Sequence, residues 1–204
     1  MVNKFSKYVL YRRTGWNNDV CLLRTSQSIM ETQTERCKRK ECVQIACLPT
    51  VPPQIGDACW IAGWGAKVLK GAPSRVLYQG GVNLLSNDYC IAHSSVNSRG
   101  INLYEKLIKD DELCGATPDH NNNGLLDIGV DACQGDSGGP LICDVGGFAI
   151  LQGVISWGVG CNREGAAGVF ADVRHFRGWI DEQTKIDTDA DYKDYEVLPP
   201  VLEK

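Results

Sequence analysis

Residues 131–141 read DACQGDSGGPL, and this stretch is the most informative part of the chain. A serine hydroxyl is a weak nucleophile unless it stands at a tight turn, near a base, with amide donors aimed at the developing oxyanion. The glycines around Ser137 permit such a backbone, and the N–H groups of Gly135 and Ser137 can converge on one point. A glycine-rich surface turn is the simpler interpretation, but it does not explain the neighbouring acids and cysteine.

Short apolar runs and turn residues surround this stretch and indicate an all-β chain. Strands are predicted at 20–23, 59–62, 80–85, 141–143, 150–156 and 169–173, with short helical turns within 87–93 and 103–109. The 22 glycines fit the many turns that such a chain requires. The best helix pattern comes last, with Asp172 as its expected cap and Phe176, Trp179 and Ile180 on one face.

The stretch 131–141 resembles the nucleophile loop of the trypsin-like serine endopeptidases, which have the chymotrypsin fold. Other segments resemble this family in the same order, over roughly residues 5–183. They are the aspartate-bearing strand (17–23), the connector (47–49), the opening of the second barrel (59–65), the pocket walls (156–158 and 168–170) and the closing helix (179–180). The resemblance implies two antiparallel Greek-key barrels, the first incomplete, plus a C-terminal helix.

The resemblance also implies catalytic roles. Ser137 is the expected nucleophile, Asp19 the acid that orients a histidine, and the amides of Gly135 and Ser137 the oxyanion hole. An Asn-Asn-Asp segment alone more often forms a mere turn, but the family's order of His, Asp and Ser favours Asp19. Asp136 matches the acid that pairs with a free amino terminus on activation, and the sequence shows no partner for it.

Asp131 matches the floor of the primary specificity pocket, where a carboxylate pairs with the arginine or lysine before the scissile bond. Ser156, Trp157, Gly158 and Gly168 match its walls, and the two glycines leave room for a long side chain. A solvated turn acid is the alternative reading of Asp131. The expected reaction is cleavage after Arg or Lys by acyl transfer, with protein or peptide substrates and protease inhibitors as partners.

The histidines depart from the family pattern. His93, His120 and His175 all follow Asp19, whereas the family's histidine lies well upstream, so each is interpreted as a surface residue. The sequence therefore predicts an N-terminally truncated protease domain over 1–185, with a partial first barrel and connector at 1–50 and the second barrel and helix at 51–185. The chain as given is expected to be inactive. The alternative is a non-catalytic homologue that acts as an extracellular binding module.

Ten cysteines without a CxxC unit indicate an oxidising compartment rather than zinc sites. Since residues 1–20 contain no signal-peptide run, the natural chain is expected to begin upstream and to be secreted. The resemblance implies the bridges Cys59–Cys143, Cys90–Cys114 and Cys133–Cys161. Cys47 matches a cysteine that often bonds a propeptide. Cys37 and Cys42 could close a small ring, and Cys21 is expected to be a buried thiol.

The formal net charge of −4 is concentrated at the C-terminal end. Residues 181–204 carry eight acidic and three basic side chains, so the rest of the chain is nearly neutral. This balance argues against a nucleic-acid partner. The longest apolar stretch, 146–160, is interrupted by Gln152 and too short to cross a membrane. Residues 186–204 are predicted to be a disordered acidic tail, although 191–196 could dock a basic partner.

No cofactor is required by this reaction. Asp119, Asn121, Asn123 and Asp127 nevertheless have the spacing of a calcium loop. The twelfth position is Val130, where such a loop needs a bidentate acid. A plain polar insertion is therefore the favoured interpretation, with calcium as the alternative.

Overall fold

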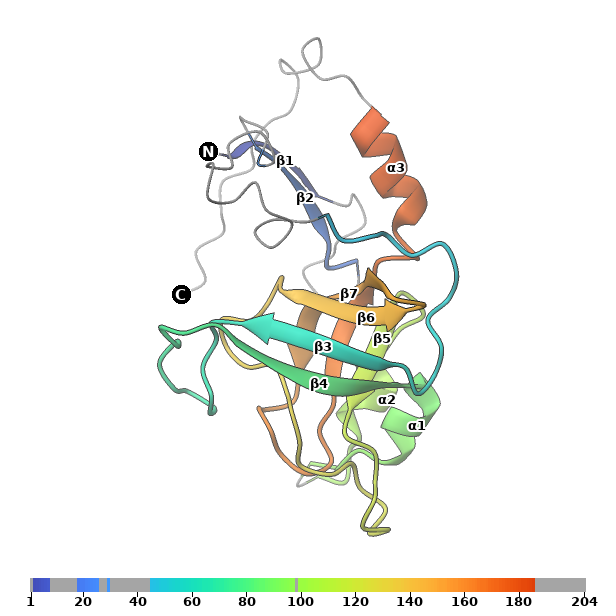
Figure 1. Ribbon diagram of the computed structural model, residues 1–204. Helices are drawn as coiled ribbons and strands as arrows, with labels where there is room; N and C mark the ends of the chain where they lie inside the picture. Colours follow the sequence, from blue (N-terminus) through green and yellow to red (C-terminus); the bar gives the residue numbers. More distant parts are fainter. Residues whose placement is uncertain (1, 8–17, 26–28, 30–44, 98, 186–204) are drawn as a thin grey trace.

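A closed six-stranded antiparallel barrel forms the centre of the computed structural model (Figure 1), with the strand order β3-β4-β5-β8-β7-β6. The structure describes residues 2–7, 18–25, 29, 45–97 and 99–185. Its elements are β1 (Val2–Lys7), β2 (Cys21–Thr25), β3 (Ala58–Gly63), β4 (Tyr78–Leu85), α1 (Asn87–Ala92), α2 (Leu103–Leu107), β5 (Glu112–Ala116), β6 (Pro140–Val145), β7 (Phe148–Gly158), β8 (Gly168–Asp172) and α3 (Arg177–Lys185).

The barrel has the predicted Greek-key connectivity. Strands β3, β4 and β5 pair in sequence, and β6 then returns to pair with β3, where Cys59 lies opposite Cys143. These two cysteines form a disulfide with a Cα–Cα distance of 4.1 Å, so the bridge joins the two strands at this point of closure. Alternating apolar residues of the strands fill the interior, including Ile61, Leu141 and Phe170.

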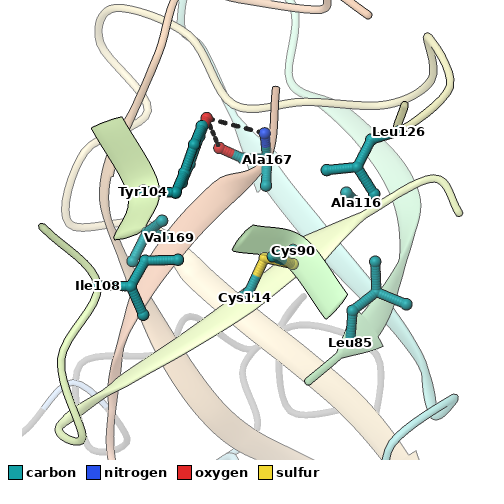
Figure 2. Close-up of a cluster of buried hydrophobic side chains, with 9 residues drawn as sticks. All are labelled: Leu85, Cys90, Tyr104, Ile108, Cys114, Ala116, Leu126, Ala167 and Val169. Carbon is teal, nitrogen blue, oxygen red and sulfur yellow. Dashed lines mark hydrogen bonds between the residues drawn. A yellow bond between two sulfur atoms is a disulfide. The ribbon is translucent and has the colours of Figure 1, made fainter. Parts of the chain in front are cut away.

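A second apolar cluster lies where α1 and α2 pack beside β5 and β8 (Figure 2). The disulfide Cys90–Cys114 joins α1 to β5 inside this cluster, with a Cα–Cα distance of 6.6 Å. Tyr104 of α2 is almost completely buried there, at 1% exposure. The cluster therefore connects the two short helices to β8, one of the strands that bounds the functional site.

The predicted first barrel is represented by the antiparallel pair of β1 and β2 in the described part of the chain. Val20 and Leu22 pack with Phe176 and Ile180, so this sheet and α3 share an apolar cluster. Figure 1 shows both at the same end of the barrel. Residues 37, 42 and 186–204, on which the small ring and the acidic tail were predicted, lie outside the described residues.

Two local predictions were wrong. Cys21 is exposed rather than buried, as are four of the five residues of β2. Asp172 does not cap the last helix, because it ends β8 and α3 begins five residues later. Its carboxylate instead accepts the N–H of Arg174 at 2.9 Å, which stabilises the turn between the two elements.

Candidate active site

Two consecutive tight turns present Ser137 to solvent. The N–H of Asp136 bonds the carbonyl of Cys133 at 3.0 Å, and the N–H of Gly139 bonds the carbonyl of Asp136 at 2.9 Å. Gly135 and Gly138, each third in its turn, have φ angles of 97° and 80°. Side chains other than glycine rarely adopt this left-handed conformation, so the two glycines define the course of the loop.

The backbone donors of this loop are available to a ligand. Within the described residues, no hydrogen bond occupies the N–H of Gly135, the N–H of Ser137 or the Ser137 hydroxyl. Both residues are exposed. An oxyanion that forms beside Ser137 could therefore be met by two amide donors that have no competing acceptor in the loop.

Asp136 has partners that the sequence did not reveal. Its carboxylate accepts the N–H of Gly65 at 2.8 Å and the N–H of Cys133 at 3.0 Å. A Cβ at Gly63 would lie 1.9 Å from Asp136 Oδ1, and one at Gly65 would lie 2.5 Å from its Oδ2. The two glycines after Ile61 therefore allow the end of β3 to approach the carboxylate and fix the residue next to Ser137.

Asp19 lies beside the same site. Its Oδ2 accepts a hydrogen bond from the Ser156 hydroxyl at 2.8 Å, although 137 positions separate the two residues in sequence. Ser156 and Ser137 line one pocket, so the predicted orienting acid reaches the surroundings of the predicted nucleophile.

The pocket next to Ser137 has a volume of about 290 Å³. It brings together every residue predicted for substrate binding and adds the disulfide Cys133–Cys161, which spans 5.3 Å between Cα atoms. Gly168 lies close to Asp131, because a Cβ built on it would be 3.5 Å from Asp131 Oδ1. The pocket is lined by Asp131, Ala132, Cys133, Gln134, Ser137, Ile155, Ser156, Trp157, Gly158, Gly160, Cys161, Gly168, Val169 and Phe170.

Asp131 is the acidic side chain in this lining. Burial raises the pKa of its carboxyl, and the nearby charge of Asp136 adds to the increase, while the N–H groups of Asn162 and Ala132 act in the opposite direction. The Asn162 N–H lies 2.8 Å from Asp131 Oδ2. A cation that entered the pocket would relieve the unfavourable burial of this charge.

Tyr104 was not predicted, and it bonds two residues that adjoin the pocket walls. Its hydroxyl donates to the carbonyl of Ala167 at 2.8 Å and accepts the N–H of Ala167 at 2.9 Å (Figure 2). It also accepts the N–H of Val159 at 3.3 Å. These bonds join the ends of β7 and β8, next to Gly158 and Gly168. Nothing in the sequence around Tyr104 indicates this role.

All three histidines are engaged away from the pocket. His93 Nδ1 lies 2.9 Å from the Tyr89 carbonyl, and its ring stacks on Tyr89. His120 Nδ1 lies 3.5 Å from Asp127 Oδ2, and the His175 ring contacts Phe176 edge to face. None of them lines the pocket that contains Ser137.

The loop predicted as a polar insertion is held together by its own polar groups. Asp119 accepts the N–H groups of Asn123 and Gly124 at 3.2 and 2.8 Å, and Asp127 accepts the N–H of His120 at 3.0 Å. Among the described residues, no group of three or more His, Cys, Asp or Glu side chains is arranged to hold a metal ion.

Comparisons with known proteins agree with this geometry. The family model described as trypsin matches residues 2–180. The mouse hepatocyte growth factor activator serine protease is 34% identical over 189 residues, which are 90% of this chain but 26% of that protein. The chain thus spans about a quarter of the length of this relative.

A solved structure has a similar fold. It is that of neuropsin, a serine protease expressed in the limbic system of mouse brain, with a TM-score of 0.70 and 24% identity. The match covers 90% of this chain and 70% of that one. Within the described residues, no helix is both long and apolar enough to cross a membrane.

Proposed function

Because this chain belongs to the trypsin-like family of serine proteases, we propose that its site hydrolyses peptide bonds after arginine or lysine once a catalytic base is supplied. The observation that carries this proposal is the single pocket shared by Ser137, Asp131 and the Ser156 that bonds Asp19. Family membership implies protein substrates, and the carboxylate of Asp131 supports a cationic side chain as the group recognised.

In the proposed reaction, the Ser137 hydroxyl attacks the scissile carbonyl and forms a tetrahedral oxyanion. The N–H groups of Gly135 and Ser137 stabilise this oxyanion, and collapse of the intermediate expels the amine to leave an acyl-enzyme that water hydrolyses. A histidine held by Asp19 would take the serine proton and return it to the leaving amine. Asp19 accepts the Ser156 hydroxyl on one oxygen and retains acceptor capacity for such an imidazole.

The polypeptide of residues 1–204 does not supply that imidazole in the proposed scheme, because its three histidines are engaged elsewhere. We therefore propose that this polypeptide alone has very low peptidase activity. Its disulfides and its family support an extracellular location.

The same placement of the histidines favours a second candidate, a non-catalytic homologue that binds basic peptide segments in the Asp131 pocket. The two candidates share the recognition of a cation and differ in the chemistry of Ser137. An assay of binding alone can therefore test their common basis.

The experiment is titration with p-aminobenzamidine, whose amidinium group carries one positive charge on a flat ring. We expect saturable binding to the wild-type chain and a loss of about 100-fold in affinity in Asp131→Ser, because the buried ion pair is removed. Asp110→Ser, which alters an exposed acid, is the matched control. Equal affinity in wild type and Asp131→Ser would contradict the proposal.

A further inference from the structure

Glu112 is a buried acid outside the predicted site that nevertheless contacts it. The side chain is 3% exposed and lies at the start of β5. Its Oε1 accepts a hydrogen bond from the indole Nε1 of Trp157 at 2.8 Å, and its Oε2 accepts the N–H of Lys109 at 2.9 Å. Trp157 lines the pocket, so Glu112 touches a wall residue from the protein interior.

The neighbouring acid makes a parallel contact. Asp111 is 8% exposed, and its Oδ2 accepts the N–H of Asn18 at 2.8 Å, immediately before Asp19. Asp111 thus bonds the turn that carries Asp19, and the adjacent Glu112 bonds the indole of Trp157, the residue after Ser156. Since Ser156 donates to Asp19, these contacts tie the predicted acid and the pocket wall to the start of β5.

We propose that Glu112 is a positioning residue for the substrate site: its carboxylate fixes the Trp157 indole from inside the protein and thereby sets the shape of the pocket wall. This inference rests on the proposed function, in which that wall faces the substrate. Peptide never touches Glu112, because the side chain is covered.

The two hydrogen bonds of Glu112 favour the ionised form. Both of its partners are donors, so a carboxylate accepts them more strongly than a protonated carboxyl, whose O–H would have no acceptor in this pair of contacts. Burial raises the pKa of Glu112 to about 7, while the bonds from Trp157 and Lys109 oppose the increase. The carboxyl therefore changes charge close to neutral pH.

Two neighbouring charges in the described part of the chain act on the Glu112 carboxyl. Asp111 raises the pKa of Glu112 and the Lys109 cation lowers it. Strand β7 contributes the indole of Trp157, and β8 places Ala171 opposite Glu112. The nearest acid of β8, Asp172, is turned toward the Arg174 N–H, and α1 contributes the neutral amide of Asn87, which bonds the Glu112 carbonyl.

The test follows the Trp157 indole N–H by ¹H–¹⁵N NMR between pH 5.5 and 8.5, with Trp157→Phe identifying the resonance. We expect a chemical shift that titrates with a midpoint near 7 in the wild type and does not titrate in Glu112→Gln, whose amide oxygen still accepts the indole proton. Asp110→Asn, an exposed acid two residues away, should keep the wild-type titration. A wild-type shift that still titrates in Glu112→Gln overturns the inference, and so does an indole shift that is the same in wild type and Glu112→Leu at pH 8.

Ligand binding provides the second readout. p-Aminobenzamidine is a small probe for the cation-binding end of the pocket, at Asp131. A tripeptidyl agmatine places the same kind of cation there and also extends past Trp157. At pH 8 we expect Glu112→Leu to weaken binding of the tripeptidyl agmatine about fivefold, because the hydrogen bond that holds the Trp157 indole is lost. Glu112→Gln, which can still accept that bond, should restore the affinity. Unchanged affinity in Glu112→Leu overturns the inference, whereas failure of both probes to bind the wild type overturns the proposed function.

Discussion

Three carboxylates around the pocket have different surroundings, and these surroundings decide what each can do. Asp136 is bonded by two backbone amides and is fixed in place. Asp131 faces the pocket, where burial raises its pKa and leaves it receptive to a cation. Glu112 is the most deeply buried of the three and bonds an indole. In the proposed function, the same functional group would therefore support the loop at Asp136, recognise a cation at Asp131 and position the indole at Glu112.

Glu112 should make stability depend on pH. Because the pKa of Glu112 in the fold, about 7, lies above its ordinary value of 4.5, the protonated form is favoured in the folded state. Its contribution to stability is therefore complete below pH 4.5 and is lost as the pH rises through 7. From pH 4.5 to 8, we expect the unfolding free energy of Glu112→Gln to gain about 3 kcal/mol relative to the wild type.

Urea unfolding at each pH measures this difference, and subtraction removes the parallel contributions of Asp131 and Asp172, whose pKa values burial also raises. A constant difference between the two proteins across the range would show that Glu112 does not titrate differently in the fold. The ionised carboxylate that holds Trp157 is thus expected to be the less stable form of the protein.

Gly65 should not tolerate a side chain. A Cβ there would lie 2.5 Å from Asp136 Oδ2, so Gly65→Ala must displace the carboxylate that the Gly65 N–H holds. We expect a loss of about 2 kcal/mol in unfolding free energy and weaker p-aminobenzamidine binding. Gly178→Ala is the control, because a Cβ at that helical position meets nothing within 4 Å. Equal effects of the two substitutions would argue against the contact.

At the level of elements, the apolar runs predicted five of the six barrel strands, and β5 was missed. Residues 112–116 begin with an acid, contain Gly115 and show no alternation, because four of the five residues are buried. Strand β5 is covered on both edges by β4 and β8 and is anchored by Cys114. Its strand character comes from tertiary contacts, which a local pattern does not contain.

The disulfides should differ in what they support. Cys133–Cys161 lines the pocket, whereas Cys59–Cys143 closes the barrel between β3 and β6. Replacing either pair by alanine should cost roughly 2–4 kcal/mol of stability. Only the loss of Cys133–Cys161 should also weaken p-aminobenzamidine, measured under conditions where both variants remain folded. Equal affinities in the two variants would mean that the bridge does not shape the pocket.

For the whole molecule, the sequence nominated the candidate residues that one motif contains, and it did not nominate those that the fold brings beside them. Ser137, Asp131 and Gly135 lie within one stretch, so a single resemblance nominated all three, and the structure places Ser137 and Asp131 in the lining of one pocket. Glu112 contacts Trp157 of β7 across 45 residues of sequence, and Tyr104 contacts Ala167, just before β8, across 63 residues. Neither residue has a local pattern that distinguishes it from an ordinary charged or core residue. Their contacts with the pocket walls could therefore be found only in the folded structure.

The arrangement of the whole chain predicts slow reaction of Ser137 with a fluorophosphonate probe. Asp19 bonds Ser156 beside the loop that carries Ser137, but the chain's three histidines bond Tyr89, pair with Asp127 or pack on Phe176. Loss of the base of a serine triad lowers turnover by about 10⁶-fold, and the probe depends on the same activated hydroxyl. Labelling of wild type and Ser137→Ala should therefore be nearly equal over hours, while p-aminobenzamidine still binds. Rapid labelling that Ser137→Ala abolishes would mean that another group of this chain acts as the base.

Supplying a histidine-bearing family segment in trans should accelerate labelling of the wild type but not of Asp19→Asn, because only a carboxylate at position 19 can both orient the imidazole and stabilise its charge.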